Sequence, residues 1–354
     1  MSKRSEITFV QAINDSIRQA MEIDKKVLCY GLGVTDPKAV FGTTEKLEQI
    51  FGPDRVFDIP CSENAITGIG VGAALLGYKS VMTHQRLDFF LLAMDQLVNS
   101  AAKWNYMFGG NTPVPITIRL ILGRGWGQGP THSQNLQAWF AHIPGLKVVS
   151  PSNASDAKGL LIASIFDPSP VVFLEHRWLH NSKSDVLNDS FSVEIGKANV
   201  VKSGSDITLV TSSYLVAEAL DAAEYVLNSF GISSEVIDLR TIKPLDTDTI
   251  LASVKKTKRI LCIDPGASSF SVSSEIIFRI IENLDHKSIE AISKIGMPDI
   301  PEPTSYALTK NFYNNADDII NKVLDMFGHT QLQKPIIRKQ EHHDVPGKWF
   351  TGPF

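Results

Sequence analysis

The sequence contains little of what marks secreted, membrane-spanning or metal-binding proteins. It has three cysteines in 354 residues and no Cys-x-x-Cys pair, which excludes a disulfide framework and predicts reduced thiols, mostly in the core. No apolar run is long enough to span a bilayer, and no apolar leader follows the first methionine. Histidine, cysteine and acidic residues do not cluster at metal-ligand spacing. These absences predict a cytoplasmic protein without a membrane partner.

An excess of charge and the strongest nucleotide-binding signatures are also missing. The formal net charge is −4, too small to indicate nucleic acid or a membrane surface as a partner. There is no GxxxxGK phosphate-binding loop. The stretches "GLGVTD" (31–36) and "GIGVGA" (68–73) approach dinucleotide-binding patterns. The second falls inside a predicted helix, so it lacks the strand-to-helix turn that the fingerprint needs.

The chain does contain short β-branched runs that alternate with helix-period segments, which predicts mainly parallel sheets flanked by helices. Hydrophobic residues make up 43% of the sequence, enough for the cores of two α/β domains. A polar, irregular stretch at 181–190 separates two such runs, and the composition turns polar after Gly328. We therefore predict domains at 1–190 and 191–328. A tail or arm at 329–354 is expected to be disordered or to fold on a partner.

The expected elements follow from hydrophobic periodicity and glycine punctuation. Strands are predicted within 25–33, 79–84, 114–122, 146–152, 170–177, 205–213, 233–242 and 259–266. Helices are predicted to begin near Phe9 and at Glu63, and to lie within 89–109, 135–143, 154–167, 214–231, 271–284 and 316–328.

Glu63 is the first residue that suggests chemistry. It begins a glycine- and alanine-rich helix, where unpaired N–H groups favour an acid. Yet this helix is built for tight burial, and burying a charge is costly. The small residues Ala65, Gly68 and Gly72 would let another helix approach closely, and in an enzyme of this size that helix could belong to a second subunit.

A second candidate region is the glycine-rich loop "GRGWGQGPTHSQ" (123–134), which joins a strand to a helix. Ligands bind at such loops in α/β sheets, and His132 is suited to carry a proton near neutral pH. His132 could equally cap the helix or bond a backbone carbonyl. Of Phe89 and Phe90, which follow the strand at 79–84, at least one is expected in the core.

His84, Arg86 and Asp88 stand at the end of the same strand. Side chains of this kind either line a polar pocket or are simply solvated.

Several motifs in one order resemble a known family. The chain is similar to the β subunit of the thiamine-diphosphate-dependent 2-oxoacid dehydrogenase E1 components, of which the pyruvate and branched-chain enzymes are the type cases. The resemblance runs from about Phe9 to about Phe327. It implies a transketolase-like pyrimidine-binding domain followed by a transketolase C-terminal-like domain. It rests on "RVFDIPCSENAITGIGVGAALLG", "LDFFLLAMDQLVNSAAKWNYMFGG", "PVPITIR", "HSQNLQAWFAHIPGLKVVSPSNASDAKGLL", "DPSPVVFLE", "IGKA" and "EVIDLRTIKPLD".

The resemblance implies roles for four residues. Glu63 aligns with the glutamate that hydrogen-bonds N1′ of the cofactor's aminopyrimidine and stabilises its imino tautomer. Phe89 aligns with the aromatic residue that packs on that ring, and Gln85 is assigned to the same cofactor site. His132 aligns with the active-site histidine of the β subunit.

The resemblance also implies ions and partners. A structural potassium site of some members corresponds to the carbonyls of Ile116, Ser164, Ile165 and Asp167, with Ser169. In this family a GDG…N motif holds the diphosphate and Mg²⁺, and the chain contains no Gly-Asp-Gly. An E1 α-like subunit would therefore supply those ligands in an α₂β₂ heterotetramer. A lipoyl-bearing acyltransferase would be a further partner.

The chain also departs from the family pattern. Thr83 stands where members carry an acidic residue, and it opens the polar wall "THQRLDF". The first glycine turn lacks both of the family's acids, Trp126 occupies the histidine loop where smaller residues are common, and the C-terminal 26 residues exceed the usual end. Trp349, Phe350 and Phe354 are expected to anchor that tail on a neighbouring subunit.

Three functions remain open on these grounds. The first is decarboxylation of a 2-oxo acid with acyl transfer to a lipoyl group or another acceptor. The second is a two-subunit, transketolase-like carboligase that joins the acyl or ketol unit to an aldehyde or keto-sugar acceptor. The third is a non-catalytic interaction subunit, against which the retained Glu63, Phe89 and His132 argue.

Overall fold

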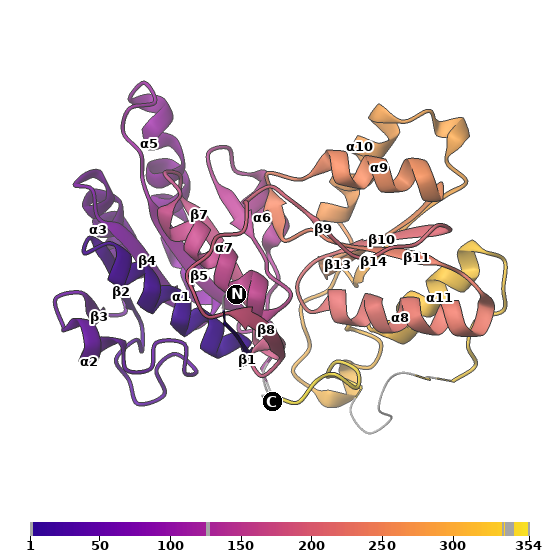
Figure 1. The fold of residues 1–354 in the computed structure, drawn as a ribbon, viewed down its shortest axis with the longest axis horizontal. Coiled ribbons are helices and arrows are strands. Elements are labelled where there is room, and N and C mark those ends of the chain that lie inside the picture. Colours follow the sequence, from indigo (N-terminus) through magenta and orange to yellow (C-terminus); the bar gives the residue numbers. More distant parts are fainter. Residues whose placement is uncertain (1–2, 125–127, 335, 337–342, 353–354) are drawn as a thin grey trace.

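The chain folds into two α/β units that lie side by side (Figure 1). The computed structural model describes residues 3–124, 128–334, 336 and 343–352. Each unit has a mainly parallel sheet with helices on both faces, so the predicted fold class is confirmed. All three cysteines are free thiols; Cys29 and Cys262 are buried and Cys61 is exposed.

The first unit is built on a seven-stranded sheet in the order β12-β6-β7-β5-β4-β2-β3. All its neighbours run parallel except β12, which is antiparallel to β6. Its other strands are β2 (Val27–Gly31), β3 (Val56–Asp58), β4 (Lys79–His84), β5 (Ile116–Leu122), β6 (Lys147–Val149) and β7 (Val171–His176).

Both faces of this sheet are covered, because its strands are apolar on both sides. Along β5, every residue is buried. One face packs on α1 (Phe9–Ile23) and α7 (Ala154–Phe166), and the other packs on α3 (Glu63–Leu75), α4 (Leu87–Phe90) and α6 (Gln137–His142). Two core layers result, and each continues into the second unit.

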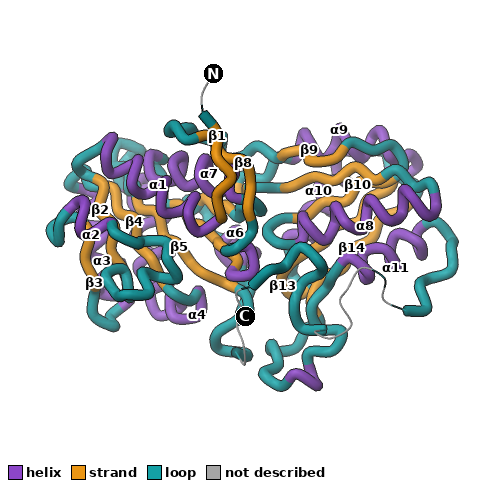
Figure 2. The backbone as a smooth tube through the Cα atoms, turned by 60° about the horizontal axis from the view of Figure 1, so that its bottom comes forward, coloured by secondary structure: helices purple, strands orange, loops and turns teal. Residues whose placement is uncertain are grey.

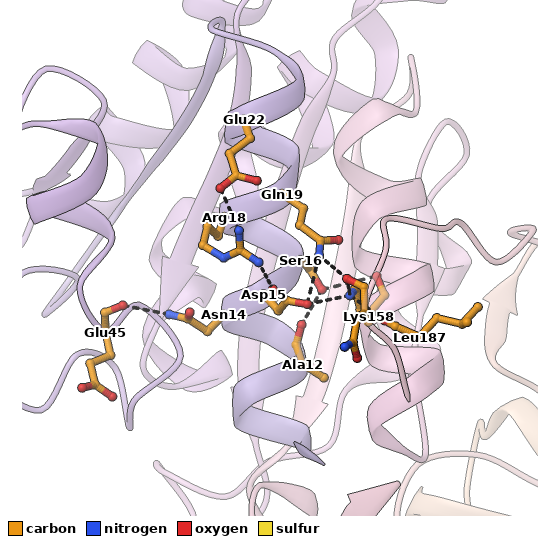
Figure 3. A network of polar contacts seen from close by, with 11 residues as sticks. Ala12, Asn14, Asp15, Ser16, Arg18, Gln19, Glu22, Glu45, Lys158 and Leu187 are labelled. Atoms are coloured by element: carbon orange, nitrogen blue, oxygen red, sulfur yellow. Dashed lines mark hydrogen bonds and ion pairs between the residues drawn. The ribbon is translucent and has the colours of Figure 1, made fainter. Parts of the chain in front are cut away.

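Helices α1 and α7 are joined by a buried lysine (Figure 3). The Lys158 ammonium lies 2.5 Å from the Asp15 carboxylate and donates to the carbonyls of Leu187 and Asn188 at 2.8 and 3.0 Å. Its side chain is fully buried, whereas Asp15 keeps 22% exposure and also pairs with Arg18. The lysine therefore ties the two helices to the chain at Leu187 and Asn188.

The long helix predicted at 89–109 is a chain of helical pieces. After α4 come the turn Leu91–Ala93, a π-helical stretch Gln96–Ala101 and α5 (Ala102–Met107). The predicted stop at two glycines is confirmed, since Gly109 and Gly110 have φ of 74° and 80°, where a side chain would be strained. A short helix, α2 (Leu47–Phe51), precedes β3.

The second unit has a five-stranded sheet in the order β14-β13-β10-β11-β9, parallel except at β9. Helices α8 (Leu215–Phe230) and α11 (Ala316–Met326) cover one face, and α9 (Thr247–Thr257) and α10 (Val272–Asn283) cover the other. Its strands are β9 (Asn199–Lys202), β10 (Ile207–Thr211), β11 (Ser234–Asp238), β13 (Arg259–Ala267) and β14 (Ala291–Met297). Strands β9 and β14 and helix α9 were not predicted.

One strand from the second half of the sequence belongs to the first sheet. Strand β12 (Thr241–Lys243) pairs antiparallel with β6. The stretch at 181–190, predicted to be irregular, contains β8 (Lys183–Leu187), which pairs antiparallel with β1 (Arg4–Thr8) (Figure 2). The prediction of an irregular stretch is therefore wrong for these residues, because an N-terminal strand supplies their hydrogen-bond partners.

The tail folds back on its own chain. Its last described residues, 343–352, lie near the junction of both units (Figure 1). Trp349 donates through Nε1 to Glu218 on α8 at 2.7 Å, and Phe350 is only 7% exposed, beside Trp178. The expected anchoring on a neighbouring subunit is therefore wrong for Trp349 and Phe350, and Phe354 lies outside the described residues.

Candidate active site

Glu63 is the first residue of α3, directly after the loop from β3. Its side chain is 7% exposed, and no partner for its carboxylate exists in the described part of the chain. Thr67, one turn later, donates its hydroxyl to the Glu63 backbone carbonyl at 2.8 Å. The helix start favours the negative charge, and the Glu63 oxygens are not among the unpartnered side-chain atoms that are fully shut off from solvent. Such a carboxylate is poised for a donor that a ligand brings.

Phe89 on α4 and His132 in the loop after β5 come together, as a shared site requires. Their rings meet edge to face at 5.2 Å and 85°. Phe89 is 37% exposed, whereas Phe90 is fully buried, so Phe90 is the core residue of the pair. His132 is held by its own loop: its backbone N–H donates to Gly129 at 3.0 Å, and its Nδ1 lies 3.0 Å from the Thr131 hydroxyl.

The wall at the end of β4 is buried, so the solvated alternative is wrong for His84 and Arg86. His84 has no partner for either ring nitrogen among the described residues, and burial lowers its pKa to about 4, which keeps the imidazole neutral. Arg86 donates to the Gly123 carbonyl at 2.8 Å and to the Gln128 side chain. Burial lowers the pKa of Arg86, and Asp88 opposes that shift.

Gln85 and Asp88, also in the wall, contact two different loops. The Gln85 amide packs against Gly33, where an added Cβ would come within 2.2 Å of Nε2. Glycine is required there for that contact and for its φ of 76°. Asp88 accepts from the Gln134 side chain at 2.8 Å, so the wall is tied to the loop that carries His132.

Thr83 replaces an acidic residue of the family pattern, and the neighbouring Arg119 has its carboxylate partner on another strand of the sheet. The Thr83 hydroxyl accepts from Arg119, 3.2 Å away on the neighbouring strand β5. Arg119 forms an ion pair with Glu175 on β7. Its Nη2 lies 2.9 Å from Oε1 and 2.8 Å from Oε2 of the carboxylate, and both side chains are fully buried. Burial alone would raise the pKa of Glu175, but the Arg119 charge and His180 lower it to about 2. The counter-charge of Arg119 therefore comes from β7.

One acidic residue near this site was not among the predicted site residues. Glu302 comes from the second unit, is 6% exposed, and accepts from the Tyr313 hydroxyl at 3.1 Å and from Asn135 at 3.5 Å. Burial raises its pKa to about 8, and Asp88 adds to that shift. A lone glutamate between two prolines carries no periodicity or motif, so only the fold reveals its position.

The residues of the expected potassium site lie at the end of α7 and the start of β5. The Ser164 carbonyl accepts from the Asp167 N–H at 3.3 Å, and the Asp167 carboxylate pairs with Lys147 at 2.5 Å and accepts from the Ser169 N–H at 2.8 Å. Pro168 accepts from the Val114 N–H, which brings this turn to the β5 end near Ile116. Carbonyls at a helix C-terminus favour a cation, so the backbone fits one. Within the described residues, no cluster of three His, Cys, Asp or Glu side chains could hold a metal.

The exposed face of α3 is partly apolar. Nothing lies within 4 Å of a Cβ built on Gly72, while Ile69 on the same helix and Leu76 directly after it are 64% and 75% exposed. Gly68, by contrast, packs against the Gln96 side chain of this chain. The "GIGVGA" stretch lies inside α3, away from any strand-to-helix turn. In the described residues, no helix is long and apolar enough to cross a membrane.

Comparison with known proteins agrees with this geometry. The family model "Transketolase, pyrimidine binding domain" matches residues 5–182, and "Transketolase, C-terminal domain" matches residues 196–319. A solved structure described as "Split gene transketolase, inactive beta4 tetramer" has a TM-score of 0.75 at 19% identity, covers 91% of this chain and 98% of its own, and shows the shared fold. Fold and models together define a two-domain chain of transketolase type.

Two relatives narrow the assignment. The mitochondrial pyruvate dehydrogenase E1 component subunit beta-1 of Oryza sativa subsp. japonica is 40% identical over 319 residues, which are 89% of this chain and 85% of the relative. The pyruvate dehydrogenase E1 component subunit beta of Staphylococcus epidermidis is 39% identical over 319 residues, which are 90% of this chain and 98% of the relative. This chain belongs to the family of pyruvate dehydrogenase E1 β subunits, which confirms the resemblance in its motifs.

Proposed function

We propose that this chain is the β subunit of a two-component, thiamine-diphosphate-dependent E1 enzyme that decarboxylates a 2-oxo acid and transfers the acyl group. The observation that carries the proposal is the Glu63 carboxylate, buried at the start of α3 and without a donor among the described residues. A protonated ring nitrogen is a donor that would satisfy it. The exposed Phe89 ring and His132 stand together in the same unit.

Each residue then has a distinct task. Thiamine diphosphate, when bound, supplies the electron sink for loss of CO₂. Glu63 would hold the proton at N1′ of the aminopyrimidine, and Phe89 would pack on that ring. Gln85 would contribute to the same cofactor site, and His132 would exchange a proton with the substrate, as a histidine can near neutral pH.

The active enzyme needs an α-like subunit. The sequence has no Gly-Asp-Gly, so we assign the diphosphate and Mg²⁺ ligands to that subunit, in an α₂β₂ heterotetramer. The exposed apolar residues of α3 support a subunit contact beside Glu63. A lipoyl-bearing acyltransferase is the proposed acyl acceptor, and the α7 carbonyls with Ser169 are the proposed K⁺ ligands. Three free thiols support a reducing compartment, which we take to be the cytoplasm.

One observation favours a second candidate, a carboligase. Arg86 is 5% exposed, and in the part of the chain that the structure describes no carboxylate forms an ion pair with it. A buried guanidinium beside a neutral His84 is more polar than an acyl group requires. An aldehyde or keto-sugar acceptor would use such donors.

The test is turnover by the chain co-expressed with an α-like subunit, with thiamine diphosphate and Mg²⁺. We expect Glu63→Gln to lose about 10²- to 10⁴-fold of CO₂ release from 2-oxo acids, while folding is kept. Glu48→Gln, which changes another acid in a first helical turn, is the matched control. Near-normal turnover by Glu63→Gln would refute its role. Release that depends on an aldehyde or keto-sugar, and not on an artificial electron acceptor, would favour the carboligase.

A further inference from the structure

The last described residues form a fixed strap across the molecule. We define the strap as residues 343–350. Glu218, fully buried on α8, accepts from the Gly347 N–H at 2.8 Å and from Trp349 Nε1 at 2.7 Å, and also from the first N–H of α11. Phe350 packs edge-on to Trp178 with ring centroids 6.3 Å apart. A buried carboxylate with three donors holds a segment firmly.

The strap reaches the loop that carries His132. The Asp344 carboxylate lies 3.0 Å from the Arg124 guanidinium, and the two side chains are 13% and 6% exposed. Arg124 also donates to the Thr304 carbonyl at 3.2 Å and lies 6.0 Å from the centre of the Tyr313 ring. Of the carboxylates that the structure describes, Asp344 alone forms an ion pair with Arg124. Without it, the buried guanidinium would have no ion-pair partner among the described residues, and Glu302 would be the carboxyl group that still acts on it.

Thr304 and its neighbour Glu302 contact the histidine loop at two further points. A Cβ at Gly129 would come within 2.0 Å of the Thr304 hydroxyl, so the loop backbone lies directly on that residue. Asn135, beyond His132, donates to Glu302 at 3.5 Å. The strap also contacts the segment that contains Glu302 and Thr304, because His343 Nε2 donates to the Tyr306 carbonyl at 2.6 Å.

We propose that Asp344 is a positioning residue: through Arg124 and Thr304, on which Gly129 packs, the strap holds residues 128–135 so that His132 stays beside Phe89. Arg124, Gly129 and Asn135 straddle His132 in the sequence, so the three anchors together restrict how far the histidine can move. The strap lies beyond Phe327, where the motifs shared with the family end. The catalytic consequence rests on the proposed function of His132; the structural link does not.

The first test measures the link without any substrate. In the full-length chain, Asp344→Asn should increase hydrogen exchange in the peptide that covers 128–136 by about 10-fold or more, because the loop loses a buried anchor. The control is Lys348→Gln, on the same strap, whose partner Asp221 is on α8 and not on the loop. Asp344→Glu, which keeps the charge, should restore most of the protection. Equal exchange in Asp344→Asn and Lys348→Gln would overturn the proposal.

The second test measures catalysis in the complex with the α-like subunit. We expect Asp344→Asn to lower kcat by about 10- to 100-fold, because a small displacement of a reacting group is costly, with KM for the 2-oxo acid changed far less. Unchanged kcat despite faster exchange would overturn the positioning role. If the wild-type complex turns over no 2-oxo acid while the exchange result holds, the proposed function fails and the strap stands. Should Asp344→Asn not fold, Trp349→Phe removes one donor to Glu218 and must give the same exchange result.

Discussion

Replacement of Glu175 by glutamine tests the buried ion pair beneath the wall. Glu175 and Arg119 are both fully buried, and Arg119 Nη2 contacts the two carboxylate oxygens of Glu175 at 2.8 and 2.9 Å. Glutamine keeps the shape of the side chain and removes only its charge. The Arg119 guanidinium then stays buried with the Thr83 hydroxyl and a neutral amide as its acceptors.

The size of the loss follows from the pKa of Glu175. It is lowered from 4.5 to about 2, and roughly 1.4 kcal/mol per pH unit gives about 3 kcal/mol of stability at pH 7. Removing one partner of a buried pair costs about 3–5 kcal/mol in general. Because the native pKa is depressed, this stability is present above pH 4.5 and is lost as the pH falls toward 2.

The assay is urea unfolding of the full chain at pH 7, followed by circular dichroism. Glu175→Gln should lower the free energy of unfolding by about 3–5 kcal/mol. Glu6→Gln is the control, because the Glu6 and Lys183 side chains, 3.6 Å apart, are 70% and 59% exposed, and exposed pairs contribute about 0–1 kcal/mol. If both variants lose the same amount, the reasoning is refuted. The double change Arg119→Met with Glu175→Leu should recover most of the loss, because no buried charge remains.

Three further predictions concern other buried groups. The Glu302 pKa of about 8 means that the native state keeps a proton which the unfolded chain has lost. The free energy of unfolding should therefore fall by about 1.4 kcal/mol per pH unit between pH 4.5 and 8. Glu302→Gln should reduce that slope in urea titrations, and an unchanged slope would contradict the raised pKa. Phe90→Ala should cost about 3–5 kcal/mol of stability, while Phe89→Ala, already 37% exposed, should cost much less and instead weaken thiamine diphosphate binding by the α-containing complex. Lys158→Met should cost about 2–4 kcal/mol, because it removes a fully buried ammonium that bonds Asp15 and the carbonyls of Leu187 and Asn188. A loss no larger than that of Lys322→Met, which removes a surface pair with Asp325, would show that the lysine contributes no more than a surface charge.

The strands and helices of this fold follow from local patterns. Short runs of apolar, β-branched residues placed β5 and β7, and helical spacing placed α1, α7 and α8, within a residue or two of their observed bounds. Strand β8 escaped prediction because its polar sequence, Lys183–Leu187, is stabilised only by pairing with β1. Strand β12 escaped because a three-residue strand is defined by the sheet that it joins, not by its own sequence.

The candidate site divides in the same way. Glu63, Phe89 and His132 stood out because motifs in one order carry them, and the structure brings the last two into contact. Arg124, Glu302 and Asp344 carry no motif, and their contacts join parts of the chain that are far apart in sequence.

The sequence by itself determined the class of the protein: its periodicities dictate an α/β sheet in each half, and its motifs dictate the family. Only the tertiary structure decided which charges are neutralised by which partners, such as Arg119 by Glu175 and Arg124 by Asp344. The reason is physical. Secondary structure depends on neighbours within a few residues, whereas a buried charge is stable only with a partner that folding brings from a distant part of the chain.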